Sequence, residues 1–530
     1  MALPLFAFAR IIRAGFVMVR EGVFSLVEPP PGLGKRAQLA LRIIRAFERR
    51  SVRDTKASER LSSALARLGP SYIKVGQFLA TRPDVVGKAA ALDLRHLQDQ
   101  LPPFSQVEAE RTIEEAFGRT VDDLFLSFSA PIAAASIAQV HVAEVERDGV
   151  ASKVAVKILR PDVEAGFKRD LESFYLAARL AERLVPTLRR LRPVAVVDTL
   201  ASWVSMEMDF RMEAAAISEI GQNTEADEGF RVPAVDWDLC SRSVLTTEWV
   251  NGLKMSDVEA IKEQDHDCPG IARTLIQSFL RQAVRDGFFH ADMHQGNLFL
   301  ADDGVIVAVD FGITGRLNSS EQQFLAEILF GFIRRDYQRV AKVHFDAGYV
   351  PANQDVDRFA QALRAIGEPL HGQKAADISM ARLLSQLLEV TELFDMHTQT
   401  RLILLQKTMV VVEGVARTLD PNLDMWATAE PVIADWMMKR IGPAGRLRET
   451  GKGLEAIVQL INEAPVLVER ADRISRELDS MAASGIRLDV QTIEDLARAQ
   501  SRHFRFYKIG FWFLAAALIG TSFVGNDWFG

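Results

Sequence analysis

Cysteine is almost absent from this chain of 530 residues, which contains only Cys240 and Cys268. Two cysteines cannot form a disulfide framework, so a small disulfide-stabilised extracellular domain is excluded and a reducing compartment is favoured. An excess of positive charge is also lacking: the formal net charge is −7, which gives no electrostatic argument for binding nucleic acid. Internal repeats and low-complexity segments are missing as well. What is present is a globular composition, 48% hydrophobic and 25% charged, in a chain long enough for roughly two to four domains.

The most informative stretch of the sequence is residues 290–312. Asp292 and Asn297 are five positions apart, and the triplet Asp-Phe-Gly follows at 310–312. Protein kinases place a catalytic-loop Asp and Asn at this spacing, and an Asp-Phe-Gly after a short hairpin. Magnesium prefers oxygen ligands, so Asn297 and Asp310 are predicted to hold Mg²⁺. Asp292 is predicted to be the catalytic residue that orients the group attacking the phosphoryl group.

A hairpin is predicted between Asn297 and Asp310. Residues 298–300 are apolar, Asp-Asp-Gly at 302–304 is a turn signal, and 305–309 is typical of a second strand. Such a hairpin would return Asp310 to the end at which Asn297 lies, so that both side chains face one ion.

A zinc site is the competing interpretation of the same stretch. His290, Asp292 and His294 are residue types that commonly bind zinc. No convincing set of further ligands lies nearby in the sequence, so the kinase-like interpretation is favoured.

A second hairpin is predicted over residues 137–159, with its turn at 148–149. Its second strand carries Val-Ala-Val-Lys at 154–157, which resembles the kinase strand whose lysine holds the nucleotide phosphates. Lys157 lies among apolar strand residues and needs an anionic partner, because burying an unpaired ammonium group is costly. A lysine on an exposed edge is the alternative interpretation.

The partner of Lys157 is expected on a helix predicted over residues 198–220. Glu207, Asp209 and Glu213 lie within that helix. Glu213 is the predicted partner of Lys157 and would help to position the phosphates. Solvated charges on a helix face are the alternative interpretation.

An alanine-rich run stands where ordinary kinases have a glycine-rich loop over the phosphates. Alanine permits fewer backbone conformations than glycine, so a phosphate cover made from this run would be stiffer and differently shaped. A tight helix or turn is the usual alternative for such a run. The predicted nucleotide-binding residues are Ala133, Ala134, Ala135 and Ser136.

The kinase hinge is predicted shortly after residue 243. Residues 243–249 are typical of a strand, and 250–252 are typical of a turn. A hinge holds adenine through backbone groups, so Glu248 and Val250 are predicted to contact the base. The side chains themselves carry little information here.

Residues 509–525 contain no charged residue. At about 1.5 Å per residue, a helix of this length would span about 25 Å, slightly less than the hydrocarbon core of a bilayer. With Arg502, Arg505 and Lys508 before it, the segment is predicted to be a transmembrane helix whose N-terminal side is cytoplasmic. A buried C-terminal helix and a re-entrant hairpin are the alternatives.

Residues 1–27 are apolar apart from Arg10, Arg13, Arg20 and Glu21. These charges fall within roughly a 100° arc of a helix, which is the pattern of an interfacial amphipathic helix. A secretory signal is disfavoured, because the arginines interrupt the apolar run. An ordinary helix packed on the domain is an equal alternative.

Further motifs narrow the resemblance to one family. Lys-Val-Gly-Gln at 74–77 matches a Lys-x-Gly-Gln signature, which Thr-Arg-Pro-Asp at 81–84 and Leu-Gln-Asp-Gln-Leu-Pro-Pro-Phe at 97–104 extend. Glu-Met-Asp at 207–209 matches a Glu-x-Asp signature. With the alanine-rich loop, these motifs make the chain resemble the UbiB family of atypical kinase-like proteins, the bacterial relatives of the mitochondrial coenzyme Q kinases, over roughly residues 35–440.

This resemblance implies an α+β, bilobal protein kinase-like fold with a helical N-terminal extension, a helical C-lobe and a C-terminal hydrophobic (transmembrane) helix. The extension would cover the active site, with Lys74 and Gln77 near Glu207 and Asp209, where a peptide substrate would otherwise lie. The pairing is physically reasonable, because a lysine among apolar helix residues needs a carboxylate partner. The implied domains are 1–34, an amphipathic membrane-contact segment and linker; 35–129, the helical Lys-x-Gly-Gln extension; 130–250, the N-lobe with its alanine-rich loop; 251–440, the C-lobe; 441–508, a helical tail; and 509–525, the transmembrane helix.

The resemblance implies ATP and Mg²⁺ as cofactors of a membrane-associated protein that supports ubiquinone biosynthesis. An ATPase is the favoured hypothesis, because no Ala-Pro-Glu follows Asp-Phe-Gly and the usual peptide-docking platform is therefore expected to be missing. The alternatives are a small-molecule or lipid kinase, and a nucleotide-binding scaffold or lipid chaperone without phosphoryl transfer. The bacterial inner membrane is the expected location, with the catalytic domain in the cytoplasm. Expected partners are the lipid bilayer, prenylated quinone intermediates and other quinone-biosynthesis proteins, but no nucleic acid. The amphipathic stretch at 454–481 is compatible with packing on the lobe, with pairing to a second copy in a homodimer and with lying against the membrane.

Overall fold

The computed structural model describes residues 3–23, 47–49, 57–80, 94, 101–184, 192–371, 390, 393–394, 396 and 400–441. The chain divides into two units, Met1–Lys439 and Arg440–Gly530, and the elements below belong to the first, except that the last helix runs on to Ile441. The predicted tail beyond residue 441 and the predicted transmembrane helix at 509–525 lie outside the described residues. Among the helices that are described, none is long and apolar enough to cross a membrane.

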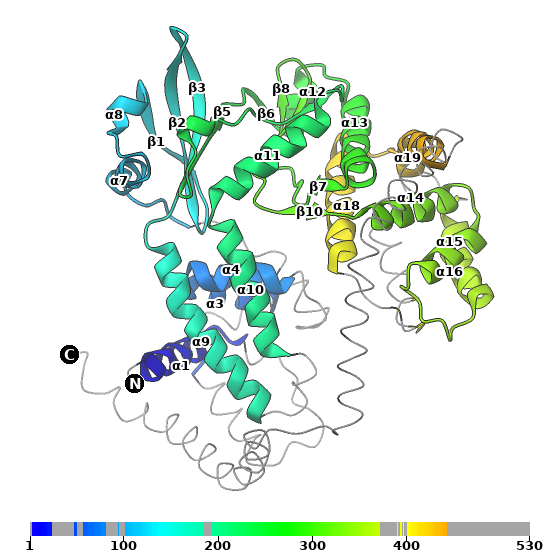
Figure 1. The fold of residues 1–530 in the computed structure, drawn as a ribbon, viewed down its shortest axis with the longest axis horizontal. Helices are drawn as coiled ribbons and strands as arrows, with labels where there is room; N and C mark the ends of the chain where they lie inside the picture. The colour runs from blue at the N-terminus through cyan, green and yellow to red at the C-terminus, as the bar shows by residue number, and fades with distance from the viewer. Residues whose placement is uncertain are drawn as a thin grey trace, which may run out of the picture. The chain divides into compact units, whose positions relative to one another are not determined.

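A four-stranded antiparallel sheet forms the smaller lobe (Figure 1). In spatial order its strands are β1 (Ser127–Ala134), β2 (Ala138–Arg147), β3 (Val150–Leu159) and β5 (Val244–Glu248). The predicted hairpin at 137–159 is confirmed, because β2 and β3 pair along their whole length. Asp148 and Gly149 form its turn with φ values of 51° and 77°. Positive φ at both positions is what this tight hairpin turn requires, and an Asp-Gly pair adopts it readily.

Successive side chains of β3 point to opposite faces of the sheet, and only one of these faces is part of the core. Val154, Val156 and Ile158 are buried and pack with Ile113 of helix α7 (Gln106–Phe117). Lys157 lies between two of them in the sequence and therefore points to the other face of the sheet. The short helix α8 (Val121–Leu124) continues the cover over the buried face.

The helix predicted over residues 198–220 is two helices, so the prediction of one continuous helix is wrong. Helix α10 (Pro193–Glu207) ends two residues before α11 (Phe210–Thr224) begins. Asp209 caps α11: its backbone is extended, and its carboxylate accepts the N–H of Arg211. Aspartate is among the best N-cap residues, so it starts a new helix instead of continuing the old one.

Two small sheets lie in the larger lobe. One contains, in spatial order, β4 (Phe230–Arg231), β9 (Ile306–Ala308), β8 (Leu298–Ala301) and β6 (Gly252–Lys254), and the other pairs β10 (Thr314–Arg316) with β7 (Phe288–His290). The predicted hairpin after Asn297 is confirmed, because β8 and β9 are antiparallel, with Leu298 opposite Ala308. This hairpin delivers the Asp-Phe-Gly triplet to the site.

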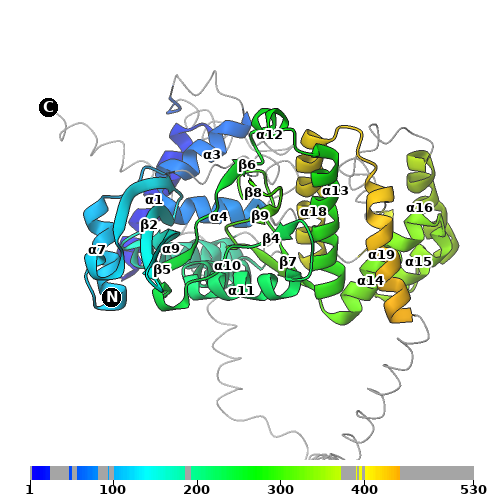
Figure 2. The same ribbon diagram turned by 90° about the horizontal axis from the view of Figure 1, so that it is seen from above.

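Helices make up most of the larger lobe, and α13 and α18 lie side by side within it (Figure 2). After the short 3₁₀ helix η4 (Trp237–Leu239), they are α12 (Val258–Glu263), α13 (Cys268–Leu280), the π-helix η5 (Arg281–Asp286), α14 (Ser319–Ile333), α15 (Tyr337–Asp346), α16 (Val356–His371), α18 (Thr400–Leu419) and α19 (Met425–Ile441).

The N-terminal helix α1 (Leu3–Arg20) packs against α9 (Val163–Leu184), a long helix that follows β3. Arg10 donates from Nε to the hydroxyl of Ser173 at 2.8 Å and pairs with Glu172 at 3.0 Å. The packed-helix interpretation of the N-terminus is therefore confirmed for this face. Phe6 and Phe16 of the same helix are 67% and 53% exposed. The other helices of this region are α3 (Ala57–Leu68) and α4 (Pro70–Ala80).

Candidate active site

Lys157 of β3 lies between two carboxylates that come from distant parts of the chain. Its Nζ donates to both carboxylate oxygens of Glu213 on α11, at 2.8 and 3.0 Å, and to Oδ1 of Asp310 at 3.2 Å. The predicted pairing of Lys157 with Glu213 is therefore confirmed, and the exposed-edge alternative is wrong. Burial opposes the charge on Lys157, but Asp310 and Glu213 outweigh it and raise the pKa of Lys157 above its ordinary value.

The same cluster affects its two carboxyl groups differently. Burial favours protonation of Asp310, but Lys157 outweighs it and holds the pKa of Asp310 well below its usual range. Burial raises the pKa of Glu213, whose side chain is 7% exposed, and Lys157 only partly opposes this. Asp310 is consequently a carboxylate at neutral pH, and half of its side-chain surface is accessible.

The Asp-Phe-Gly triplet is held by contacts on several sides. Asp310 has a left-handed backbone with φ of 61°, a strained conformation that is concentrated at functional sites, and its Oδ1 accepts the N–H of Gly312 at 3.3 Å. Phe311 is buried, its N–H donates to Glu213 Oε1 at 3.2 Å, and its ring centre lies 4.6 Å from that of His290. Glu213 thus holds both the lysine and the triplet.

The predicted catalytic loop is closed by hydrogen bonds of its own. The N–H of Asp292 donates to Nδ1 of His290 at 3.1 Å, and Nδ2 of Asn297 donates to the carbonyl of Asp292 at 3.2 Å. The carboxylate of Asp292 is partly exposed, and Nε2 of His294 lies 3.7 Å from it. The backbone of Asp292 is therefore fixed while its carboxylate is accessible.

The two predicted magnesium ligands lie at the same end of the β8–β9 hairpin. The N–H of Val309 donates to the carbonyl of Asn297 at 2.8 Å, and Asp310 is the next residue. Because the amide nitrogen of Asn297 donates to the carbonyl of Asp292, its amide oxygen is the atom that would serve as a ligand. One ionised carboxylate and one amide oxygen are ligands that Mg²⁺ accepts when phosphate oxygens and water complete its coordination, so these residues fit the ion.

The zinc interpretation is wrong for the described residues. His290 is completely buried, and its Nδ1 already accepts the N–H of Asp292. Burial also lowers the pKa of His290, so the ring is neutral and packs beside Phe311. In the part of the chain that the structure describes, no group of three or more His, Cys, Asp or Glu could hold a metal ion.

Lys74 on α4 forms an ion pair with Glu207, the last residue of α10. Both side chains are nearly buried, at 5% and 11% exposure. Asp209, the other predicted neighbour of Lys74, pairs with Arg211 at 2.6 Å and caps α11. Gln77 lies one turn further along α4 and is half-buried. That this region covers the active site stays a prediction.

The sequence of this chain is similar to those of known kinase-like proteins. The ABC1 atypical kinase-like domain matches residues 96–344, and the UbiB helical domain matches residues 363–424. "Probable protein kinase UbiB" of Marinobacter nauticus is 38% identical over 88% of this chain and 85% of its own length. The protein of the same name from Pseudomonas aeruginosa (strain UCBPP-PA14) is 37% identical over 88% of each chain. The chain belongs to the UbiB family.

Among the solved structures to which this chain is similar is "The complex structure of Rv3197-erythromycin from Mycobacterium tuberculosis". It covers 75% of this chain and 98% of its own length, at 24% identity and a TM-score of 0.47. In this UbiB-family chain the ABC1 match includes Lys157, Glu213 and the stretch 290–312, whereas Lys74 lies before it.

The UbiB helical domain contributes to the site through α18. The hydroxyl of buried Thr408 lies 2.9 Å from the carbonyl oxygens of both Ala291 and Leu404, which share its one hydrogen. The residue before Asp292 is therefore held by a helix whose function the sequence did not reveal. Thr408 and Ala291 are 117 positions apart, so no local sequence pattern could have indicated this contribution of α18.

The alanine-rich run of this UbiB-family chain forms the end of β1 and the turn into β2. Ala133 and Ala134 belong to the strand, and the N–H of Ala135 closes the turn by donating to the carbonyl of Ala138 at 2.7 Å. Ser136 is completely buried. The run is therefore a strand and turn and not a helix, and contact with nucleotide stays a prediction.

The predicted hinge follows β5. Glu248 ends that strand, and its carboxylate pairs with Arg231 at 3.1 Å. Val250 is buried between β5 and β6. The strand and the turn are confirmed, whereas the contact of Glu248 and Val250 with adenine is not tested.

The sequence did not reveal the residues that attach α11 to the larger lobe. Arg316 Nη2 donates to Oε2 of Glu219 at 2.7 Å. Arg285 pairs with Asp227 at 2.6 Å and donates to the carbonyl of Asn223 at 2.8 Å. The partners are 97, 58 and 62 positions apart, so no local pattern could have indicated them.

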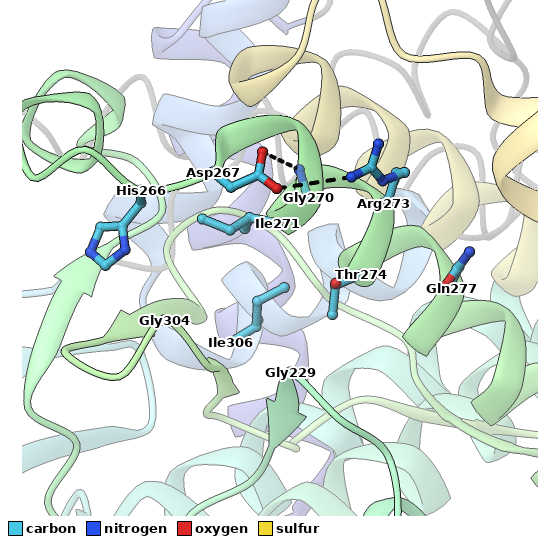
Figure 3. Close-up of a pocket in the computed structure, with 10 residues that line it drawn as sticks. All are labelled: Gly229, His266, Asp267, Gly270, Ile271, Arg273, Thr274, Gln277, Gly304 and Ile306. Carbon is cyan, nitrogen blue, oxygen red and sulfur yellow. Dashed lines mark hydrogen bonds and ion pairs between the residues drawn. The ribbon is translucent and has the colours of Figure 1, made fainter.

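A cavity of about 410 Å³ lies elsewhere in the larger lobe, at the start of α13 (Figure 3). Ile271 and Ile306 lie near its middle, with His266 and Arg273 on opposite sides. Asp267 accepts the N–H of Gly270 at 3.0 Å at its edge. None of the predicted catalytic, nucleotide-binding or magnesium-binding residues lines this cavity, so it is distinct from the predicted site.

Proposed function

We propose that this UbiB-family chain binds Mg²⁺-ATP at Lys157 and hydrolyses it at a membrane surface, in support of ubiquinone biosynthesis. The observation that carries the proposal is the position of Lys157, held between Glu213 and Asp310. A lysine, a helix glutamate and an Asp-Phe-Gly aspartate that meet in this way are the parts that kinases use to hold nucleotide phosphates.

Each residue of the cluster has a role in this proposal. Lys157 would hold phosphate oxygens, and Glu213 would keep Lys157 oriented. Asn297 and Asp310 would hold Mg²⁺, which when bound neutralises charge on the phosphoryl group. Asp292 would orient a water molecule or another acceptor, since its carboxylate is accessible and its backbone is fixed.

The connection after Asp-Phe-Gly argues against a protein acceptor. The chain enters β10 at Thr314, pairs with β7 and starts α14 at Ser319. This leaves no segment for the peptide-docking platform of ordinary kinases. Water, or a small molecule that reaches Asp292, is the favoured acceptor.

The exposed face of α1 supports the membrane part of the proposal. Phe6, Ile12 and Phe16 are exposed, and with Arg13 and Arg20 they fall within roughly a 120° arc of the helix. The guanidinium of Arg20 lies 5.7 Å from the centre of the Phe16 ring. Apolar side chains flanked by arginines suit the interface of a bilayer with anionic headgroups.

The ubiquinone part of the proposal rests on family membership. Ubiquinone precursors carry long isoprenoid tails and reside in the bilayer. ATP turnover at the membrane surface would help to make such intermediates accessible to soluble enzymes, which are the proposed partners together with the bilayer. The bacterial inner membrane, with the catalytic domain on its cytoplasmic side, is the proposed location.

Incubation of the purified full-length chain with γ-labelled ATP, Mg²⁺ and a bacterial lipid extract tests the type of reaction. The proposal predicts labelled free phosphate and no labelled lipid. A labelled lipid would show that the chain is a lipid kinase and would refute the ATPase proposal. The absence of both products would refute phosphoryl transfer and leave a nucleotide-binding scaffold.

A further inference from the structure

Arg160, the first residue after β3, makes hydrogen bonds both to the alanine-rich turn and to the part of the helical extension just before α7. Its backbone N–H donates to the carbonyl of Ile137 at 2.7 Å, and its Nη2 donates to the carbonyl of Ala135 at 3.4 Å. The same nitrogen donates to the carbonyl of Pro102 at 2.9 Å, and the guanidinium carbon lies 5.3 Å from the centre of the Phe104 ring. One residue therefore joins the turn to the extension.

A second connection runs through buried side chains of β2. Oε1 of Gln139 accepts the N–H of Phe104 at 2.9 Å, and Nε2 of Gln139 lies 2.9 Å from Nε2 of His141. Nδ1 of His141 lies 2.8 Å from the carbonyl oxygen of Ser129 in β1. Gln139 and His141 are completely buried, so water does not compete for these contacts.

The donors and acceptors of this connection can be assigned in only one way. The Ser129 carbonyl can only accept, so Nδ1 of His141 must carry the hydrogen. Burial lowers the pKa of His141, which keeps the ring neutral and makes its Nε2 an acceptor for the amide group of Gln139. Gln139 then presents its oxygen to the N–H of Phe104, as observed. Phe104, Gln139, His141 and Ser129 therefore form one chain of hydrogen bonds in which each donor has a matching acceptor.

This second connection ends where β1 departs from regular pairing. The register of β1 against β2 shifts between Phe128 and Pro131, and again between Pro131 and Ala133. Ser129, which His141 holds, lies within the first irregularity. The path of β1 into the alanine-rich turn is therefore set by contacts that begin in the extension.

We propose that residues 102–104 act as a brace that sets the conformation of the alanine-rich nucleotide loop, with Arg160 and Gln139 as its positioning residues. This rests on the proposed function, because it assigns the loop at 133–136 to the nucleotide phosphates. Through the brace, residues 102–104 control how tightly nucleotide binds without contacting the nucleotide themselves.

Isothermal titration of Mg²⁺-ADP into purified full-length variants tests the brace. Arg160→Met keeps an apolar chain but removes the charged hydrogen bonds to two carbonyls, so it is expected to lower the affinity roughly tenfold. Arg160→Lys retains the charge without the planar fork and is expected to have an intermediate affinity. Lys153→Met, at an exposed position of the same hairpin, is the control and is expected to bind like the unmodified chain.

Gln139→Leu provides the second test. It is expected to lower the affinity several-fold, by removing the acceptor of the Phe104 N–H. The double variant Arg160→Met/Gln139→Leu is expected to bind no more weakly than the weaker single variant, because both residues act through 102–104. Fully additive losses would indicate independent effects and overturn the brace.

Two further outcomes would also overturn the inference. One is an equal or higher affinity of the Arg160 variants for Mg²⁺-ADP. The other is a lower melting temperature with unchanged affinity, which would leave Arg160 only a structural role. Failure of the unmodified chain to bind Mg²⁺-ADP would instead refute the proposed function, and the brace with it.

Discussion

Arg316 and Glu219 connect the segment after Asp-Phe-Gly to the helix that carries Glu213, with Nη2 and Oε2 2.7 Å apart. The guanidinium of Arg316 also lies 4.2 Å from the centre of the Phe288 ring in β7. In ordinary kinases the activation segment controls the position of the equivalent helix. Here a direct ion pair connects the segment after Asp-Phe-Gly to α11, the helix from which Glu213 contacts Lys157.

Replacing Arg316 with Ala is expected to lower kcat/KM for ATP hydrolysis roughly three- to tenfold, with little change in melting temperature. The side chains are 62% and 42% exposed, and exposed ion pairs contribute less than about 1 kcal/mol to stability. Loss of the pair would nevertheless remove one of the contacts that attach α11 to the larger lobe, and the orientation of Glu213 depends on α11. Steady-state phosphate release measures the effect.

The exchange variant Arg316→Glu/Glu219→Arg is the control for this prediction. It restores the attraction with opposite polarity and is expected to recover much of the activity. Wild-type kcat/KM in Arg316→Ala would contradict a positioning role for the pair.

Replacing Lys74 with Met is expected to destabilise the chain by about 3–5 kcal/mol, because Glu207 would keep a nearly buried charge without its lysine. Denaturant titration measures the loss. The double variant Lys74→Met/Glu207→Gln is expected to be more stable than the single variant. Lys168→Met breaks the exposed pair with Glu164 and is the control, with an expected loss below about 1 kcal/mol. A similarly small loss for Lys74→Met would argue against the buried pair.

Acidification is expected to destabilise the chain through three buried histidines, His141, His290 and His344. Burial lowers the pKa of each below its ordinary value of 6.5. As the pH falls below that value, the unfolded chain binds protons that the folded chain does not. The free energy of unfolding therefore decreases by up to about 1.4 kcal/mol per pH unit for each histidine.

Unfolding midpoints between pH 7.5 and pH 5.5 (roughly one unit either side of the ordinary histidine value) test this prediction. His344→Gln keeps a donor for the carbonyl of Val340 but does not titrate, so it is expected to reduce the slope. A free energy of unfolding that is constant over this range would show that folding does not lower the pKa values of these histidines.

Membrane binding is expected to depend on the exposed face of α1. Phe6→Ser/Phe16→Ser is expected to reduce co-sedimentation with phosphatidylglycerol vesicles several-fold, because the variant loses apolar contact area. Leu126→Ser, at an exposed position outside α1, is the control. Unchanged sedimentation of the α1 variant would remove this helix from the membrane part of the proposal.

The sequence predicted those parts of the site in which local spacing determines geometry. A two-residue turn fixes the register of β2 and β3, and therefore the face on which Lys157 lies. The β8–β9 hairpin likewise brings Asn297 and Asp310 to one end. The residue types then follow from the chemistry of phosphates and magnesium.

The remaining parts depend on contacts between distant segments. The break after Glu207 was missed, because the N-cap preference of Asp209 prevails over the helical pattern on both sides. The contacts of Arg316 and Arg160 join segments that only the tertiary structure brings together. A charged residue followed by an apolar pattern gives no sign of which carbonyl or carboxylate it meets.

Magnesium-dependent phosphate release by the purified full-length chain is the most direct test of the central claim. The account predicts ATP hydrolysis that requires Mg²⁺ and falls at least about a hundredfold in Asp310→Asn, which removes a metal ligand and a partner of Lys157. Asp302→Asn, in the turn of the same hairpin, is the matched control and is expected to hydrolyse ATP normally. Equal turnover by Asp310→Asn and the unmodified chain would contradict the account.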